Sequence, residues 1–266
     1  MFSSLRFNST DLLQRSVWLT LVFGIFMLPY ILVGCKREPE ISTSQVQWMS
    51  KDGVDLYATL YEKTQSTQLF SPGLILLHSV NESRAIWVGS AERFVDLGFV
   101  VLAVDLRGHG ESSIKSGQVY SENKFNYGDW QSSIHDIALA KEALLTAGAN
   151  PDNLFILGSG LGANIGFKYA HTDSAIQGMI LLSPGLEYNT ISIEKSMSEN
   201  RRLPVLFLAT DGDSYSAGSV EKLKALTPAY AESRLYPGTA HGIDLLNGNS
   251  KVMGDIQNWL DPIVQK

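Results

Sequence analysis

The sequence predicts an α/β fold: a mostly parallel sheet of about eight strands, opened by an antiparallel hairpin and covered by helices on both faces. Short, uniformly apolar segments, typical of buried central strands, alternate with longer segments of helical periodicity. Clusters of glycine, proline and polar residues separate these segments. Such alternation after an opening hairpin indicates a parallel sheet. No insertion is long enough to form a large cap domain.

The opening hairpin consists of residues 45–49 and 54–61, which flank the dipeptide Asp52-Gly53. The second segment, VDLYATLY, alternates apolar and polar residues, and Asp-Gly is a preferred two-residue turn. Later strands are expected at residues 73–77, 99–104, 154–157, 177–182, 205–209 and 233–236. Helices are expected at residues 87–97, 127–148, 161–171, 220–226 and 252–260. A loop is expected at residues 106–126, and the only candidate lid at 184–203.

The stretch 154–164, LFILGSGLGAN, reads as a buried strand, a tight turn and the start of a helix. Two functional templates fit its glycines. A dinucleotide-binding fingerprint, G-x-G-x-x-A, would use Gly158, Gly160 and Ala163. A nucleophile elbow, G-x-S-x-G, would use Gly158 and Gly162 and would place the nucleophile at position 160.

The surroundings of the turn disfavour the dinucleotide template. That template needs an acidic residue about 20 positions later to hold the ribose, and the next strand ends at Leu182-Ser183-Pro184 without one. The glycine loop also follows several earlier strands, whereas a dinucleotide loop usually follows the first. Dinucleotide binding therefore remains the weaker alternative, and no cofactor is expected.

Motifs in five loops point to a known family. His78 follows one predicted strand, and DLRGHGES (105–112) follows the next; LLSPGLEY (181–188), ATDGDSYS (209–216) and LYPGTAHG (235–242) come later. Together with the elbow, they resemble the α/β-hydrolase superfamily in the correct chain order. The resemblance covers about residues 45–266 and is closest to lidless dienelactone-hydrolase-like and esterase-like members.

The resemblance implies a catalytic acid and base in the order nucleophile, acid, histidine. Asp213 matches the acid, with Asp211 as the alternative, and His241 matches the base. The competing interpretation makes both aspartates turn residues that bond their own backbone and His241 a surface-loop histidine. Their loops and their order favour the catalytic assignment.

The resemblance also implies an oxyanion hole, which would use the backbone N–H groups of Val80 and Leu161. His78 matches the histidine that supports the oxyanion loop without reacting. Ser79 stands where the family usually has glycine, so the shape of the hole is expected to differ.

The nucleophile position is occupied by Gly160, which has no side chain to attack a substrate. Three hypotheses follow. The protein lacks standard serine-hydrolase chemistry and acts as a binding or scaffold protein; or it hydrolyses esters or lactones through Ser159 or through a water activated by His241; or the fold serves another purpose. Ser159 precedes the turn's apex, so its side chain should point away from the site.

The N-terminus reads as an export signal. Residues 1–15 carry two arginines, residues 17–33 are almost wholly apolar, and Cys35 is the only cysteine. The sequence Leu-Val-Gly-Cys that ends at Cys35 resembles the bacterial lipobox, which implies a lipidated cysteine; an uncleaved anchor helix is the alternative. We therefore expect a signal or anchor at 1–34, a tether at 35–44, and an exported domain held at a membrane, periplasmic or on the outer surface.

Composition argues against other classes of partner. The net charge is −6, and without a basic stripe an acidic chain is not expected to bind nucleic acid. Histidines are scattered and the single cysteine lies in the signal, so no metal site is expected. A small ester-like molecule is the expected ligand.

Overall fold

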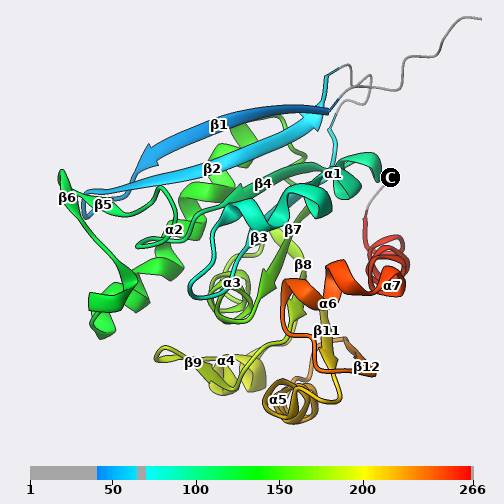
Figure 1. Ribbon diagram of the computed structural model, residues 1–266. Coiled ribbons are helices and arrows are strands. Elements are labelled where there is room, and N and C mark those ends of the chain that lie inside the picture. Colours follow the sequence, from blue (N-terminus) through cyan, green and yellow to red (C-terminus); the bar gives the residue numbers. More distant parts are fainter. Residues whose placement is uncertain (1–40, 65–69, 265–266) are drawn as a thin grey trace, which may run out of the picture. The chain divides into compact units, whose positions relative to one another are not determined.

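The computed structural model describes residues 41–64 and 70–264 as a sheet with helices on both faces (Figure 1). The sheet has ten strands in the order β12-β11-β8-β7-β3-β4-β2-β5-β6, with β1 paired to β2. Its strands are β1 (Ile41–Met49), β2 (Val54–Lys63), β3 (Gly73–Leu77), β4 (Val100–Val104), β5 (Ile114–Lys115), β6 (Gln118–Val119), β7 (Leu154–Ser159), β8 (Ile176–Leu182), β11 (Val205–Thr210) and β12 (Ala231–Tyr236). The helices are η1 (Arg84–Trp87), α1 (Val88–Asp96), η2 (Glu122–Lys124), α2 (Tyr127–Thr146), α3 (Leu161–Ala170), α4 (Glu194–Glu199), α5 (Ser214–Leu226), α6 (Ile243–Gly248) and α7 (Ser250–Leu260).

This architecture confirms the expected fold class. The strands β4, β3, β7, β8, β11 and β12 are parallel neighbours, whereas β1 and β2 pair antiparallel, and β2 joins β4 antiparallel. No large cap is present in the described part of the chain. The lid candidate 184–203 contains only the small hairpin β9 (Glu187–Tyr188) and β10 (Ile191–Ser192), followed by α4.

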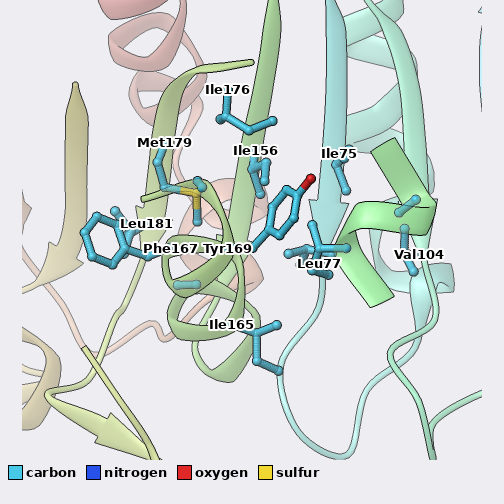
Figure 2. Close-up of a cluster of buried hydrophobic side chains, with 14 of the residues drawn as sticks. Ile75, Leu77, Val104, Ile156, Ile165, Phe167, Tyr169, Ile176, Met179 and Leu181 are labelled. Carbon is cyan, nitrogen blue, oxygen red and sulfur yellow. The ribbon is translucent and has the colours of Figure 1, made fainter. Parts of the chain in front are cut away.

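Two apolar clusters, one on each face of the sheet, hold the helices in place. In β3, Leu74 and Leu76 belong to the cluster with α1, α6 and α7, whereas Ile75 and Leu77 belong to the cluster with α2, α3 and α5. This alternation follows from the two-residue period of a strand. Figure 2 shows part of the second cluster around Ile75 and Leu77. Both faces of the central strands are therefore buried, which explains their uniformly apolar sequences.

The first strand begins earlier than expected. It starts at Ile41, which pairs with Lys63, so residues 41–44 belong to the sheet and not to a tether. The sequence obscured this because Ser42–Ser44 are polar, and an edge strand tolerates exposed polar side chains. The expected signal at 1–34, Cys35 and the rest of the tether lie outside the described residues. Within those residues, no helix is long and apolar enough to cross a bilayer.

Short elements account for the other differences. The expected loop 106–126 contains β5, β6 and η2, and α6 lies between β12 and α7. Helix α5 begins at Ser214, before the expected residue 220, because the Asp213 side chain caps it by accepting a hydrogen bond from the Ser216 N–H. Its first residues, Ser214 to Ser219, carry no apolar stripe, so hydrophobic periodicity did not reveal them.

Candidate functional site

A sharp turn joins β7 to α3 at the centre of the carboxyl edge of the sheet. Gly160 forms it with φ +50° and ψ −115°, a conformation that strains any residue with a Cβ. Its N–H donates to the Leu182 carbonyl at 2.9 Å, and its carbonyl accepts from the Ala163 N–H at 3.1 Å. Gly158 and Gly162 allow close packing, since a Cβ at either would collide with backbone atoms. The turn therefore has the form of a nucleophile elbow with glycine at its apex.

The structure brings His241 and Asp213 together. The Nδ1 atom of His241 lies 2.6 Å from Asp213 Oδ2, while the Ser216 N–H donates to Asp213 Oδ1 at 3.3 Å. Partial burial would raise the pKa of Asp213, but the hydrogen bonds from Ser216 and His241 outweigh it and hold the pKa below its ordinary value. Asp211 instead accepts from the Gly238 N–H at 3.0 Å, as a turn residue does. Of the two aspartates, only Asp213 contacts the histidine.

Two hydroxyl groups at the carboxyl ends of the neighbouring strands β8 and β11 fix the loop that carries His241. The Gly242 N–H donates to Ser183 Oγ at 2.9 Å, and Thr210 Oγ1 donates to the Ala240 carbonyl at 2.9 Å. These bonds hold the backbone on both sides of the histidine. With Nδ1 paired to Asp213, Nε2 is the nitrogen available to exchange a proton.

The Nε2 atom of His241 faces the elbow. A Cβ built on Gly160 would lie 3.3 Å from this atom, so a serine there would hold its hydroxyl beside the histidine. The ring of Tyr188 meets the His241 ring edge to face, with centroids 6.4 Å apart. The His241 side chain is 44% exposed, so a ligand from solvent can reach it.

Ser159 does not share this position. It is fully buried, and its Oγ has no hydrogen-bond partner among the described residues. The hydroxyl lies against Gly242, where a Cβ would collide with it. The structure therefore does not bring Ser159 into hydrogen-bonding contact with His241.

His78 supports the loop after β3. Its Nδ1 lies 2.6 Å from the Ser79 carbonyl, and its Nε2 accepts from the Leu106 N–H at 3.0 Å, so the ring is a neutral tautomer protonated on Nδ1. Complete burial, with the neighbouring His109 ring, lowers the pKa of His78 to about 3. It therefore stays neutral near pH 7 and fixes the backbone without exchanging protons.

The two expected oxyanion donors, the N–H groups of Val80 and Leu161, differ in whether they already have a hydrogen-bond acceptor. No group within residues 41–64 and 70–264 accepts a hydrogen bond from the Val80 N–H. The Leu161 N–H donates to Ser79 Oγ at 3.3 Å. That hydroxyl would collide with a Cβ on Gly160. The Ser79 side chain thus fills part of the space in which an elbow nucleophile would stand.

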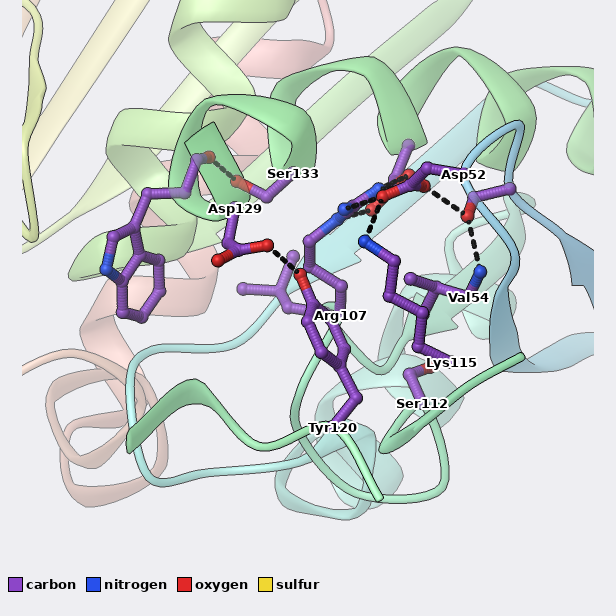
Figure 3. A network of polar contacts seen from close by, with 12 residues as sticks. Asp52, Val54, Arg107, Ser112, Lys115, Tyr120, Asp129 and Ser133 are labelled. Atoms are coloured by element: carbon purple, nitrogen blue, oxygen red, sulfur yellow. Dashed lines mark hydrogen bonds and ion pairs between the residues drawn. The ribbon is translucent and has the colours of Figure 1, made fainter. Parts of the chain in front are cut away.

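The DLRGHGES segment is structural. Arg107 is buried and contacts both oxygens of Asp136, with Nε at 2.6 Å and Nη2 at 2.7 Å, and its Nη1 lies 3.0 Å from Asp52 (Figure 3). Lys115 also contacts Asp52, at 2.8 Å. These ion pairs tie the loop after β4 to helix α2 and to the β1–β2 turn. They supply no group to the His241 site.

Sequence reasoning missed the placement of two hydroxyls. It noted Ser79 only as a departure from the family's glycine, although that departure was the available signal. It gave Ser183 no role, and nothing in the sequence around it distinguishes the residue. No cluster of potential metal ligands is found in the described residues.

Comparisons with known proteins agree with this fold. No curated protein matches the chain. Among solved structures, a Klebsiella pneumoniae subsp. pneumoniae MGH 78578 protein described as a dienelactone hydrolase superposes with a TM-score of 0.69 at 13% identity, covering 84% of this chain and 99% of its own. The acetyl xylan esterase from Paenibacillus sp. R4 gives 0.67 at 14% identity, covering 86% of each chain. A thermostable carboxyl esterase from Bacillus coagulans gives 0.66 at 14%, covering 84% and 99%.

These likenesses establish the shared fold. Residues 72–208, half of the chain, match the family model described as "Serine aminopeptidase, S33". This segment runs from the start of β3 into β11 and includes the elbow and the oxyanion loop. The chain therefore belongs to the serine aminopeptidase S33 family of the α/β-hydrolase superfamily.

Proposed function

We propose that this protein is an exported, membrane-tethered α/β-hydrolase that cleaves a small carboxylic ester or lactone without a serine at the elbow. The Asp213–His241 contact of 2.6 Å carries the proposal. The Nε2 atom of His241 faces the elbow, where an acyl group would be attacked. Asp213 holds the imidazole in the tautomer that leaves Nε2 free to accept a proton, and it stabilises the imidazolium that results.

Standard elbow chemistry is not available to this chain, because Gly160 has no oxygen or sulfur. A base at His241 still acts on any hydroxyl or water placed beside its Nε2. General-base catalysis of this kind contributes roughly 10²–10⁴-fold. Val80 and Leu161 would supply the N–H groups that stabilise the developing oxyanion.

The test is ester turnover by the full chain purified in detergent, with p-nitrophenyl acetate and a short lactone as substrates. His241→Ala and Asp213→Asn should each lower kcat/KM by about 10²–10⁴-fold. His135→Ala removes an exposed histidine on α2 and should leave turnover unchanged. Turnover that survives His241→Ala would exclude the proposed base.

A second candidate function is ligand binding without turnover, favoured by Gly160 itself. In that case the native chain releases no product from any ester, while equilibrium dialysis shows that it binds the same ester. Gly160→Ser combined with Ser79→Gly would then create turnover that the native protein lacks. This result would identify a hydrolase site from which only the nucleophile is missing.

The membrane tether rests on Leu32-Val33-Gly34-Cys35 at the end of an apolar segment. We expect lipidation of Cys35, followed by release of residues 1–34. Mass spectrometry of the mature N-terminus should find a diacylglyceryl-modified Cys35. Recovery of an intact peptide spanning residues 26–37 as the major form would refute cleavage and favour an anchor helix.

A further inference from the structure

The structure assigns the missing nucleophile to Ser79, so that the hydroxyl acted on by His241 comes from the loop after β3 and not from the elbow. This inference rests on the proposed function, since it requires His241 to be a working base. It names the group that the base activates.

Position is the first argument. A Cβ on Gly160 would collide with Ser79 Oγ, would lie 3.0 Å from Ser79 Cβ and would lie 3.3 Å from His241 Nε2. The hydroxyl of Ser79 and the reactive nitrogen of His241 therefore both lie within 3.3 Å of one point, the point from which an elbow serine would extend its own oxygen. Ser79 Oγ and His241 Nε2 form no hydrogen bond with each other among the described contacts. Catalytic hydrogen bonds are often long before a substrate binds and shorten in the complex, and rotation of the Ser79 side chain is the motion that would bring its hydroxyl to this base.

Electrostatics is the second argument. The Leu161 N–H, at the first residue of α3, donates to Ser79 Oγ at 3.3 Å. A backbone N–H at a helix N-terminus stabilises negative charge on the oxygen that it contacts. This contact favours the alkoxide that forms as Ser79 loses its proton. In this route the Val80 N–H, which has no acceptor among the described residues, is the donor left for the substrate oxyanion. The hydroxyl of Ser159, the residue before the elbow apex, is fully buried, and its Oγ has no hydrogen-bond partner among the described residues.

Rigidity is the third argument. The Ser79 N–H donates to Glu82 Oε2 at 2.7 Å, and the Ser79 carbonyl is bound by His78 Nδ1 at 2.6 Å. Both backbone groups of the residue are thus fixed, and only the side-chain torsion is left to move. Positioning of this kind is what a nucleophile requires.

The reaction balances in two steps. His241 Nε2 takes the proton from Ser79 Oγ as this oxygen bonds to the acyl carbon; the bond from that carbon to the alcohol oxygen then breaks, and the alcohol leaves with the proton from His241. In the second step His241 takes a proton from water, the hydroxide attacks the acyl-Ser79 ester, the carboxylic acid leaves, and Ser79 Oγ regains its proton.

A fluorophosphonate probe and ester turnover test the assignment on the full chain in detergent. Peptide mass spectrometry should find the phosphonate adduct on Ser79. Ser79→Ala should abolish the adduct and lower kcat/KM at least about 1,000-fold, while Ser132→Ala, a serine on α2, should change neither. Ser79→Cys should react with iodoacetamide at residue 79, a reaction that His241→Ala slows because it removes the base.

The outcomes separate the two proposals. Turnover that depends on His241 but survives Ser79→Ala, or an adduct on Ser159 instead, overturns the assignment to Ser79 and leaves the proposed function standing with water or Ser159. A native chain without turnover and without an adduct overturns both. Thermal unfolding of each variant shows whether a loss of activity reflects a loss of fold.

Discussion

Replacing Gly160 by alanine or serine should expose the competition between residues 160 and 79 for one space. A side chain at 160 adopts φ +50°, which costs about 1–3 kcal/mol. Its Cβ also collides with Ser79 Oγ, and overpacking of this kind costs about 1–3 kcal/mol more. Ser79 can relieve the collision only by rotating its side chain, because both of its backbone groups are hydrogen-bonded.

Gly148 provides the matched control. It has φ +93°, and a Cβ there would meet nothing within 4 Å, so Gly148→Ala measures left-handed strain without a collision. Gly160→Ala should lower the free energy of unfolding by the additional overpacking cost, about 1–3 kcal/mol more than Gly148→Ala. Adding Ser79→Gly to Gly160→Ala should restore the free energy of unfolding lost to overpacking. Adding it to Gly148→Ala should restore none of the stability.

Thermal unfolding measures these differences, with about 2–4 °C expected per kcal/mol for a domain of this size. Ester turnover gives the second readout. Gly160→Ser with Ser79→Gly moves the hydroxyl from the loop after β3 to the elbow, and this double variant should turn over ester at least about 100-fold faster than Gly160→Ser alone. If Ser79→Gly changes the free energy of unfolding equally in the Gly160→Ala and Gly148→Ala variants, and ester turnover does not change, then residues 160 and 79 do not compete for space and the reasoning fails.

Two further predictions concern the charged groups. The fold holds the pKa of Asp213 below its ordinary value, so this carboxylate stabilises the native state fully above the unfolded pKa of about 4 and loses that effect as the pH falls through the native pKa. Asp213→Asn should therefore lower Tm more at pH 7 than at pH 3. The absence of any such difference would contradict the lowered pKa. Arg107→Met leaves the buried Asp136 without its cation and should cost about 3–5 kcal/mol in urea denaturation, whereas Lys115→Met at the rim should cost less than about 1 kcal/mol. Equal costs would show that Arg107 is not buried as described.

Local patterns in the sequence were sufficient for the central strands of the sheet. Each central strand is buried on both faces, so its apolar run is visible without knowledge of its neighbours, and Asp-Gly marks the hairpin turn. Helix α5 was predicted too short, because its start depends on a cap by Asp213, and the same side chain binds His241. A residue with both roles carries no apolar signal for either.

The pairing of Asp213 with His241 could be expected from the resemblance to α/β-hydrolases, whose acid and histidine follow neighbouring parallel strands at one edge of the sheet. The position of the Ser79 hydroxyl could not. It depends on the lack of a side chain at Gly160, 81 positions away in the sequence, which leaves room for a side chain from the loop after β3. Contacts of this kind depend on three-dimensional packing between loops, and no periodicity in the sequence reports them.

Gly160 removes the nucleophile from the elbow, but it does not displace the groups that we propose to support one. His241, which we propose as the base, its partner Asp213 and the N–H of Leu161 are all held by backbone and side-chain contacts that do not involve a side chain at 160. What these groups require is an oxygen in the space between them. In this chain the only hydroxyl that enters that space while hydrogen-bonded to Leu161 is that of Ser79, among the residues whose positions are described. A Cβ at position 160 would collide with Ser79 Oγ in its present position, so glycine at the elbow leaves the loop serine its place beside the Leu161 N–H.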